Sequence, residues 1–227
     1  MPMQSPEVLL ALAVVIFFAI GLHEYAHCKF ADMAGDPTPS FYGRVTLNLF
    51  KHFDPLGTLM IFISSMTGVG IGWGKPAPIN PQKMRNPRFD TFVAVAMGPV
   101  SNILQAIVYA FIMRFAMGNG IFGPNEVFGA LGRDNVGFPP LLLTLGVSVN
   151  IGLALFNLIP FGVLDGHWLV GLMLPEKQRH YWFKFNRTYG WMIFVGIILL
   201  DQIANLGILW AMVGPPFLFL FRLLTGI

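Results

Sequence analysis

The sequence predicts an all-α integral membrane protein, a polytopic bundle of about 4–6 helices that forms a single domain over residues 1–227. Three observations predict this fold class. Of the 227 residues, 55% are hydrophobic and only 11% are charged, whereas soluble domains carry roughly 25% charged residues. Several apolar stretches are long enough to cross a bilayer. Basic residues gather in two of the segments between them, as in the cytoplasmic loops of membrane proteins.

The first predicted span covers about residues 6–27. No Lys or Arg precedes its uncharged stretch Val8–Leu22, and no small-residue cleavage site precedes His23. We therefore interpret it as a retained span rather than a removed signal peptide. Residues 28–54 are polar and contain helix-breaking glycine and proline. Within them, the partial alternation of apolar residues over 42–50 predicts a short β-strand or hairpin.

The next apolar stretch, Leu56–Trp73, is predicted to be a re-entrant loop that enters the membrane and returns on the same side. Hydropathy alone would favour an ordinary span. However, residues 28–90 hold seven Lys or Arg, so the positive-inside rule places both flanks of the stretch in the cytoplasm. Its glycines fit irregular backbone, which is tolerated at membrane depth only against protein or a wet cavity.

Two further spans complete the predicted core, which covers about residues 6–174. One runs over about 91–115, and the other over about 140–160, continuing after a break through 164–174. Additional C-terminal helices are expected over about 189–224. There, Pro215 and Pro216 should kink or break the last one.

Loop charge also gives an orientation. Residues 116–138 hold one basic residue and residues 175–188 hold four, so the first segment is assigned outside and the second to the cytoplasm. The N-terminus is then outside, and the first span ends at the cytoplasmic side.

The pattern His23-Glu24-Tyr25-Ala26-His27 ends the first span. On a helix, His23 and His27 share one face, where two imidazoles can bind a single Zn²⁺. Glu24 is adjacent, where its carboxylate reaches a water on the metal rather than the metal itself. Ionisable groups in a membrane helix are costly and therefore indicate function. The alternative is a helix that leaves the membrane before His23, with solvated polar residues.

A zinc protease needs a third protein ligand. Asp165 is our candidate, because it lies in an apolar stretch that Pro160, Gly162 and Gly166 break, and an acid there requires a cation. His167, two residues away, is a competing ligand. For His27 and Asp165 to meet at one depth, their spans must run in the same direction with a single crossing between them.

These residues resemble a known family. The H-E-x-x-H pattern, Asn157-Leu158-Ile159-Pro160 with Leu164-Asp165-Gly166, and Gly98-Pro99-Val100-Ser101-Asn102 occur in the order typical of the site-2 protease family of intramembrane zinc metalloproteases. The chain is most similar to its small bacterial branch without a PDZ domain. It departs from the pattern at His167, where most members have a second glycine.

The resemblance implies an endopeptidase that hydrolyses peptide bonds in or near transmembrane helices with one Zn²⁺ per chain. Glu24 would be the general base. Asn157, and also Asn102, are candidate donors to the oxyanion; the alternative for each is interhelical hydrogen bonding. The implied location is the bacterial inner membrane, with the active site towards the cytoplasm.

The expected partners are a transmembrane protein substrate and the lipid bilayer. Basic residues are too sparse to predict nucleic-acid binding, and no oligomeric state is indicated. An unwound substrate could pair with a strand edge at residues 42–50 or 76–81. Two other functions remain open: a metal transporter, and a relative that binds helices without cutting them.

Overall fold

The computed structural model describes residues 5–57, 60, 74–132, 136–204 and 206–227. Throughout these ranges the regular structure is helical, as predicted. The β-type pairing found in the described residues is one isolated antiparallel bridge, between Phe53 and Gly74. The elements are α1 (Pro6–Met33), α2 (Thr38–Phe41), η1 (Leu49–His52), η2 (Pro81–Lys83), α4 (Pro87–Gly118), α5 (Pro124–Gly132), α6 (Phe138–Asn157), α7 (Asp165–Met173), α8 (Glu176–Phe185), η3 (Asn186–Gly190), α9 (Trp191–Ala204) and α10 (Ile208–Thr225).

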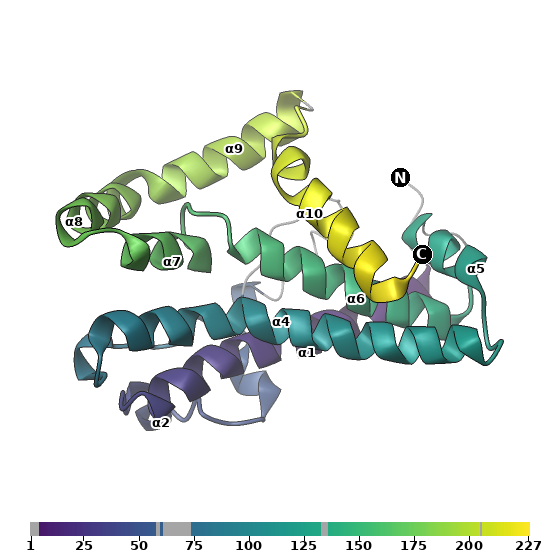
Figure 1. Ribbon diagram of the computed structural model, residues 1–227, viewed down its shortest axis with the longest axis horizontal. Coiled ribbons are helices and arrows are strands. Elements are labelled where there is room, and N and C mark those ends of the chain that lie inside the picture. The colour runs from purple at the N-terminus through teal and green to yellow at the C-terminus, as the bar shows by residue number, and fades with distance from the viewer. Residues whose placement is uncertain (1–4, 58–59, 61–73, 133–135, 205) are drawn as a thin grey trace.

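Three long helices, α1, α4 and α6, pack against one another and form the core of the molecule (Figure 1). Figure 1 shows α1 and α6 running in the same direction, with α4 antiparallel to both. Two apolar helices that pack side by side can both end at the same face of the bundle. The ends of α1 and α6 therefore bring His27 and the residues after Asn157 to the same side.

Along α1, from Ala11 to Ala31, every fourth residue is buried. Because four residues make slightly more than one turn, such residues form one nearly straight ridge along a helix. Most members above and below the histidines are small, which lets α4 approach closely, as is typical of helix contacts in membranes. The ridge consists of Ala11, Val15, Ala19, His23, His27 and Ala31, none of which is more than 5% exposed.

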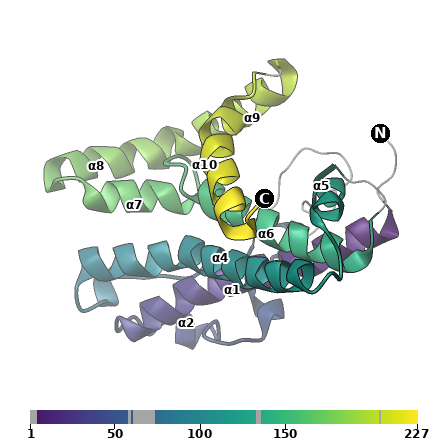
Figure 2. The same cartoon turned by 45° about the vertical axis from the view of Figure 1, so that its right-hand side comes forward.

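Helices α7 to α10 lie on the side of α4 and α6 that faces away from α1 and α2 (Figures 1 and 2). Figure 2 shows α7 and α8 as a pair that extends past the end of α6, while α10 crosses over α6 and α4. The contact between α4 and α7 is fixed at one end by Arg88. Its guanidinium donates hydrogen bonds to the carbonyls of Leu172, Met173 and Leu174, which end α7 and have no partner within it.

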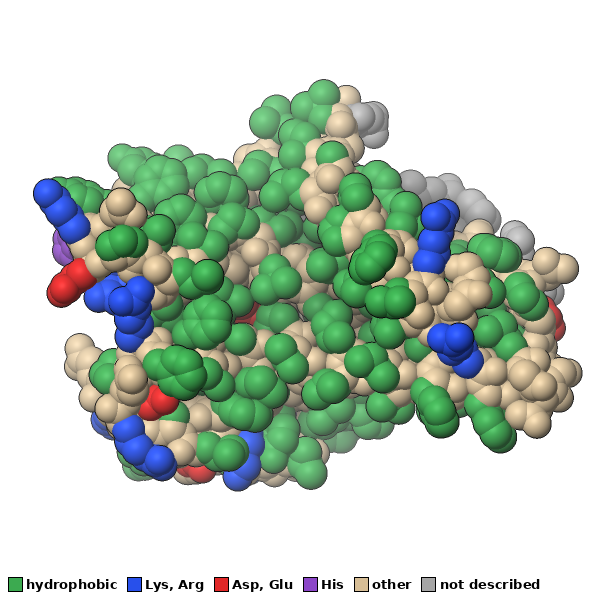
Figure 3. All heavy atoms as spheres, viewed as in Figure 1, with side chains coloured by type: hydrophobic (Ala, Val, Ile, Leu, Met, Phe, Trp, Pro, Cys, Tyr) green, Lys and Arg blue, Asp and Glu red, His purple; other side chains and the backbone are tan. Residues whose placement is uncertain are grey.

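Within the described residues, four helices are long and apolar enough to cross a membrane, namely α1, α4, α6 and α10. This agrees with the predicted bundle of about 4–6 helices. Helix α9, one of the additional C-terminal helices expected over about 189–224, has 14 residues and is not one of the four. Many of the basic side chains seen in Figure 3 lie at the end of the molecule where α2, α8 and the start of α4 lie, and others lie near the end of α10, while hydrophobic side chains cover most of this face.

The strand or hairpin predicted over residues 42–50 is wrong. The backbone there forms local hydrogen bonds instead, from Gly43 to Ser40 and from Arg44 to Pro39, and then enters η1. The alternation that suggested a strand does not separate a buried from an exposed face, because Leu47 is 67% exposed while Leu49 is buried.

Two other expectations concern the ends of the apolar stretches. Helix α1 extends to Met33, six residues beyond the predicted end of the span at His27, so the start of the polar segment is helical. Of the kink or break predicted at Pro215 and Pro216, the break is not found, because helix α10 continues through both prolines. Each proline in a helix leaves one carbonyl without its usual N–H donor, whereas ending the helix in an apolar environment would leave several N–H and carbonyl groups unpaired. The predicted re-entrant loop lies almost entirely outside the described residues.

Candidate metal centre

His23 and His27 lie one turn apart on the buried ridge of α1, and each is only 5% exposed. Their Nε2 atoms are 3.0 Å apart. The third member of the cluster is Asp165, the first residue of α7, whose Oδ2 lies 3.2 Å from Nε2 of His23 and 3.3 Å from Nε2 of His27. The structure thus brings together the three predicted ligands, which we call the metal cluster.

The chain between α6 and α7 carries Asp165 to the two histidines. Gly166 packs directly on the backbone carbonyls of Leu158 and Ile159, where an added Cβ would clash with both. This close approach folds the start of α7 back against the end of α6. The glycine after Asp165 is therefore needed to place the carboxylate.

Hydrogen bonds at the far side of each ring fix which nitrogen faces the cluster. His27 Nδ1 lies 2.9 Å from the backbone carbonyl of Ala94, an acceptor only, so Nδ1 carries the proton. His23 Nδ1 lies 2.6 Å from Oδ1 of Asn102 and donates to it. Both Nε2 atoms therefore present lone pairs. Histidines that bind metals typically donate such a hydrogen bond from the ring nitrogen that faces away from the metal, and we call the acceptor an outer partner.

The cluster fits a zinc ion. Two imidazole lone pairs and a carboxylate oxygen converge within about hydrogen-bond distance, an arrangement that is repulsive without a cation between them. Ligand atoms in a tetrahedral site with zinc bonds of about 2.0–2.1 Å are about 3.3 Å apart. The observed 3.0–3.3 Å agrees with this spacing. Three protein ligands leave one position open, as in catalytic zinc sites.

Glu24 follows His23 on α1 and faces the same region. It is adjacent in sequence to the predicted ligand His23 and lies three residues before His27 on the same helix. On its other side, a Cβ at Gly74 would be 3.3 Å from its Oε1 atom. Glu24 is thus positioned beside the metal cluster, at the edge of the segment that begins at Gly74.

Gly98 of α4 packs directly on the two imidazoles, and an added Cβ would clash with His27 and His23. We expect Gly98→Ala to push the rings apart and weaken zinc binding about 10- to 100-fold, because a methyl forced into a packed site costs about 1–3 kcal/mol. Competition with a chelator measures this. Gly118→Ala, at the end of the same helix with open space around the added Cβ, should bind zinc normally. Equal affinities in the two variants would contradict the prediction.

The other predicted residues lie around the cluster. Asn102 contacts His23, as described. Asn157 donates from Nδ2 to the carbonyl of Leu153 in its own helix, 2.9 Å away. His167 donates from Nδ1 to the backbone carbonyl of Leu164, at 2.6 Å, packs against Trp168, and is not part of the metal cluster.

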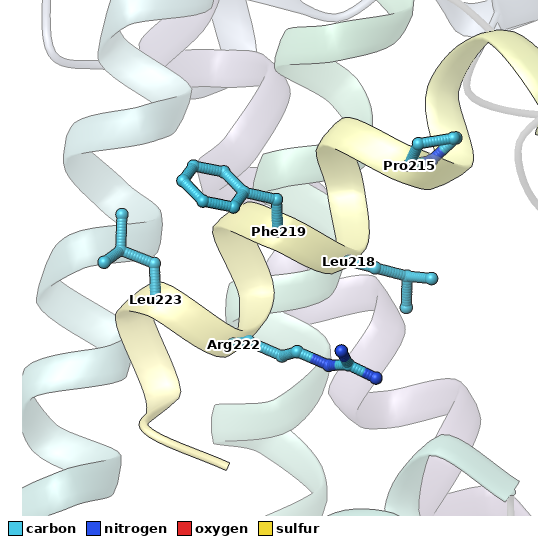
Figure 4. Close-up of a pocket in the computed structure, with 5 residues that line it drawn as sticks. All are labelled: Pro215, Leu218, Phe219, Arg222 and Leu223. Carbon is cyan, nitrogen blue, oxygen red and sulfur yellow. The ribbon is translucent and has the colours of Figure 1, made fainter.

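Neither His52 nor the surface pocket on α10 belongs to the metal cluster. His52 is fully buried, its Nε2 is 3.0 Å from the carbonyl of Thr46, and burial lowers the pKa of its imidazole. A surface pocket on α10 is lined by that helix alone (Figure 4), and Figure 4 shows Arg222 and Leu218 extending from the same side of it. None of the residues that line the pocket belongs to the metal cluster.

One residue of the site, Asn150 on α6, was not found by sequence reasoning. Its side chain is fully buried and contacts Asn102. The signal that could have found it is its position, because an amide inside an apolar span usually bonds to another helix.

Comparisons with known proteins agree with this geometry. A family model described as "Peptidase family M50" matches residues 11–200, which include the metal cluster and Glu24. A curated protein of Bacillus subtilis (strain 168), "Putative zinc metalloprotease YwhC", is similar at 29% identity over 203 residues, which cover 89% of this chain and 85% of that protein. No solved structure matches the chain.

Proposed function

The chain belongs to peptidase family M50, the site-2 protease family, and from this premise we propose that it is an intramembrane zinc endopeptidase, which hydrolyses peptide bonds in or near transmembrane helices of other membrane proteins. One observation carries the proposal. Atoms of His23 and His27, on a helix apolar enough to cross a membrane, converge at zinc-ligand spacing with an oxygen of Asp165 at the start of α7. A hydrolytic site there can reach bonds that soluble proteases cannot.

Each step assigns a role to a residue of this chain. His23, His27 and Asp165 would hold one zinc ion, which supplies a Lewis acid for the scissile carbonyl and lowers the pKa of water from about 15.7 towards about 7. Glu24 takes the proton from the attacking water and returns it to the leaving amine. The bundle around these groups limits the access of bulk water.

The two asparagines receive different roles in this proposal. Both N–H groups of Asn102 are engaged, with the carbonyl of Ala19 and with Asn150, so Asn102 positions His23 instead of donating to an oxyanion. Asn157 uses one N–H within its own helix, and no described residue accepts the other, so it remains the candidate oxyanion donor. A lower kcat for Asn157→Ala at unchanged zinc content would support this role, and an unchanged kcat would exclude it.

Of the two expected substrate edges, residues 42–50 and 76–81, the second is the better candidate, and we extend it back to Gly74. Lys75 N–H bonds to the carbonyl of His52, and the buried Arg44 donates to the carbonyls of Lys75 and Pro76. These bonds hold the segment beside Glu24, where an unwound substrate can pair with it. A photoreactive residue in place of Ala77 should cross-link to substrate, whereas one in place of the exposed Gln82 should not. Equal cross-linking at both would argue against this edge.

We place the site towards the cytoplasmic side of the bacterial inner membrane. Two observations support this: more basic side chains lie at the end of the molecule with α2, α8 and the start of α4 than elsewhere on the face in Figure 3, and His27 is about 9 Å along α1 from its end at Met33, near that end. A Lys177→Cys variant that also carries Cys28→Ala should react with an impermeant maleimide in inside-out vesicles. Reaction in intact cells instead would reverse the orientation.

Metal removal separates the proposed function from the two alternatives. We expect the purified full chain in lipid nanodiscs to cleave single-span substrates, to stop when a chelator removes zinc, and to resume when zinc returns. A transporter in sealed vesicles would instead move zinc across the bilayer without cutting. A non-catalytic relative would bind the substrates and leave them intact at every zinc concentration.

A further inference from the structure

Two asparagines from different helices form a fully buried pair behind His23. Asn102 of α4 donates from Nδ2 to Oδ1 of Asn150 on α6, at 3.0 Å. Asn102 Nδ2 also donates to the carbonyl of Ala19 on α1, at 3.0 Å, and its Oδ1 faces His23 Nδ1. Asn150 in turn donates from Nδ2 to the carbonyl of Gly146, at 2.8 Å. The chain of bonds thus runs from α6 through α4 to the metal cluster on α1.

Each amide in this chain can adopt only one orientation. The carbonyl of Gly146 accepts and cannot donate, so Asn150 must direct its NH₂ there and its oxygen towards Asn102. Asn102 then directs its NH₂ towards Asn150 and Ala19, and its oxygen towards His23. An oxygen facing His23 Nδ1 requires the ring proton on Nδ1. His23 Nε2 is therefore left with the lone pair that a metal needs.

We propose that Asn150 is a positioning residue, which holds His23 in its zinc-binding tautomer through Asn102. This inference deepens the proposed function and rests on it, because it assumes that the metal cluster binds zinc. Without the Asn150 acceptor, only the carbonyl of Ala19 opposes rotation of the Asn102 amide. In the rotated amide the NH₂ faces His23, so the ring proton moves to Nε2 and blocks the ligand atom.

The first test is zinc affinity of the full chain, measured by competition with a chelator. Asn150→Leu, which fills the space but cannot bond to Asn102, should weaken zinc binding about tenfold, at the lower end of the range for outer partners of metal ligands. Thr144→Val is the matched control, because Thr144 is on the same helix, is equally buried, and has a hydroxyl without a hydrogen-bond partner among the described residues. It should bind zinc as the parent does.

The second test reads the tautomer directly. In the zinc-free protein labelled with ¹⁵N-histidine, the His23 ring should carry its proton on Nδ1, and Asn150→Leu should shift part of the population to Nε2. Asn150→Asp in its protonated form keeps both bonds, since its carbonyl oxygen accepts from Asn102 and its O–H donates to Gly146, so it should keep the Nδ1 tautomer and an affinity within about threefold of the parent. If Asn150→Leu does not fold, the Asp variant alone decides: folded with weak zinc binding, it contradicts the proposal.

The outcomes separate this inference from the proposed function. If the parent protein binds no zinc, the proposed function fails. If the parent binds zinc and Asn150→Leu matches it in both affinity and tautomer, only the role of Asn150 fails. Equal loss of affinity in Asn150→Leu and Thr144→Val would show a general packing effect and also overturn the positioning role.

Discussion

Replacing Glu24 with glutamine is expected to abolish proteolysis while zinc remains bound. Glutamine has nearly the same shape as glutamate but cannot take a proton from water at neutral pH. General acid–base catalysis typically contributes about 10²- to 10⁴-fold, so kcat should fall at least about 100-fold. Single-turnover cleavage of a single-span substrate in nanodiscs measures the rate, and elemental analysis of the same sample measures zinc.

The matched control is Glu176→Gln, at the exposed start of α8, which should cleave at the rate of the parent. A Glu24→Gln variant that retains zinc and cuts at more than about a tenth of the parent rate would exclude Glu24 as the base. A variant that loses zinc would instead show that Glu24 contributes to metal binding.

Asp165→Asn is expected to remove zinc from the protein. On the proposed function its carboxylate would be the anionic ligand of the zinc, and a neutral amide oxygen beside two imidazoles would be a poor substitute for it. Outer partners of metal ligands are worth about 10- to 100-fold in affinity, and loss of a ligand should cost at least about 100-fold. At a zinc concentration of about 100 Kd, the parent gains about 2.7 kcal/mol of stability from the metal, so the thermal shift on adding zinc should disappear.

Asp201→Asn is the control for this substitution. Asp201 accepts a hydrogen bond from the Ile208 backbone through Oδ1, which an asparagine oxygen can also accept. Its zinc affinity and thermal shift should equal those of the parent. An Asp165→Asn variant that binds zinc as tightly as this control would assign the third ligand to another residue.

Much of the fold followed from composition, because an uncharged apolar stretch in a membrane has few alternatives to a helix. The ends of the helices were less predictable, as the extension of α1 to Met33 and the continuity of α10 through Pro215 show. The alternating apolar residues over 42–50 predict a strand, but the backbone there forms local turns around Gly43. Such turns can also place apolar residues at alternating positions, and they need no partner strand.

The metal cluster was predictable because its chemistry restricts residue types. Few side chains bind zinc, and acids in an apolar stretch are rare, so His23, His27 and Asp165 could be selected before any contact was known. The surrounding residues could not be selected in this way. Ala94 acts through its backbone carbonyl, which any residue has, and Asn150 acts on His23 only through a neighbour on a different helix.

The distance along the chain between the two halves of the metal cluster has a consequence for biosynthesis. His27 is translated 138 residues before Asp165, which at about 5–20 residues per second corresponds to about 7 to 28 s. During that interval the nascent chain contains the H-E-x-x-H helix but lacks a complete ligand set. On the proposed function, the protein emerges from the ribosome as an inactive hydrolase, and neighbouring chains at the insertion site are spared until α6 and α7 have followed.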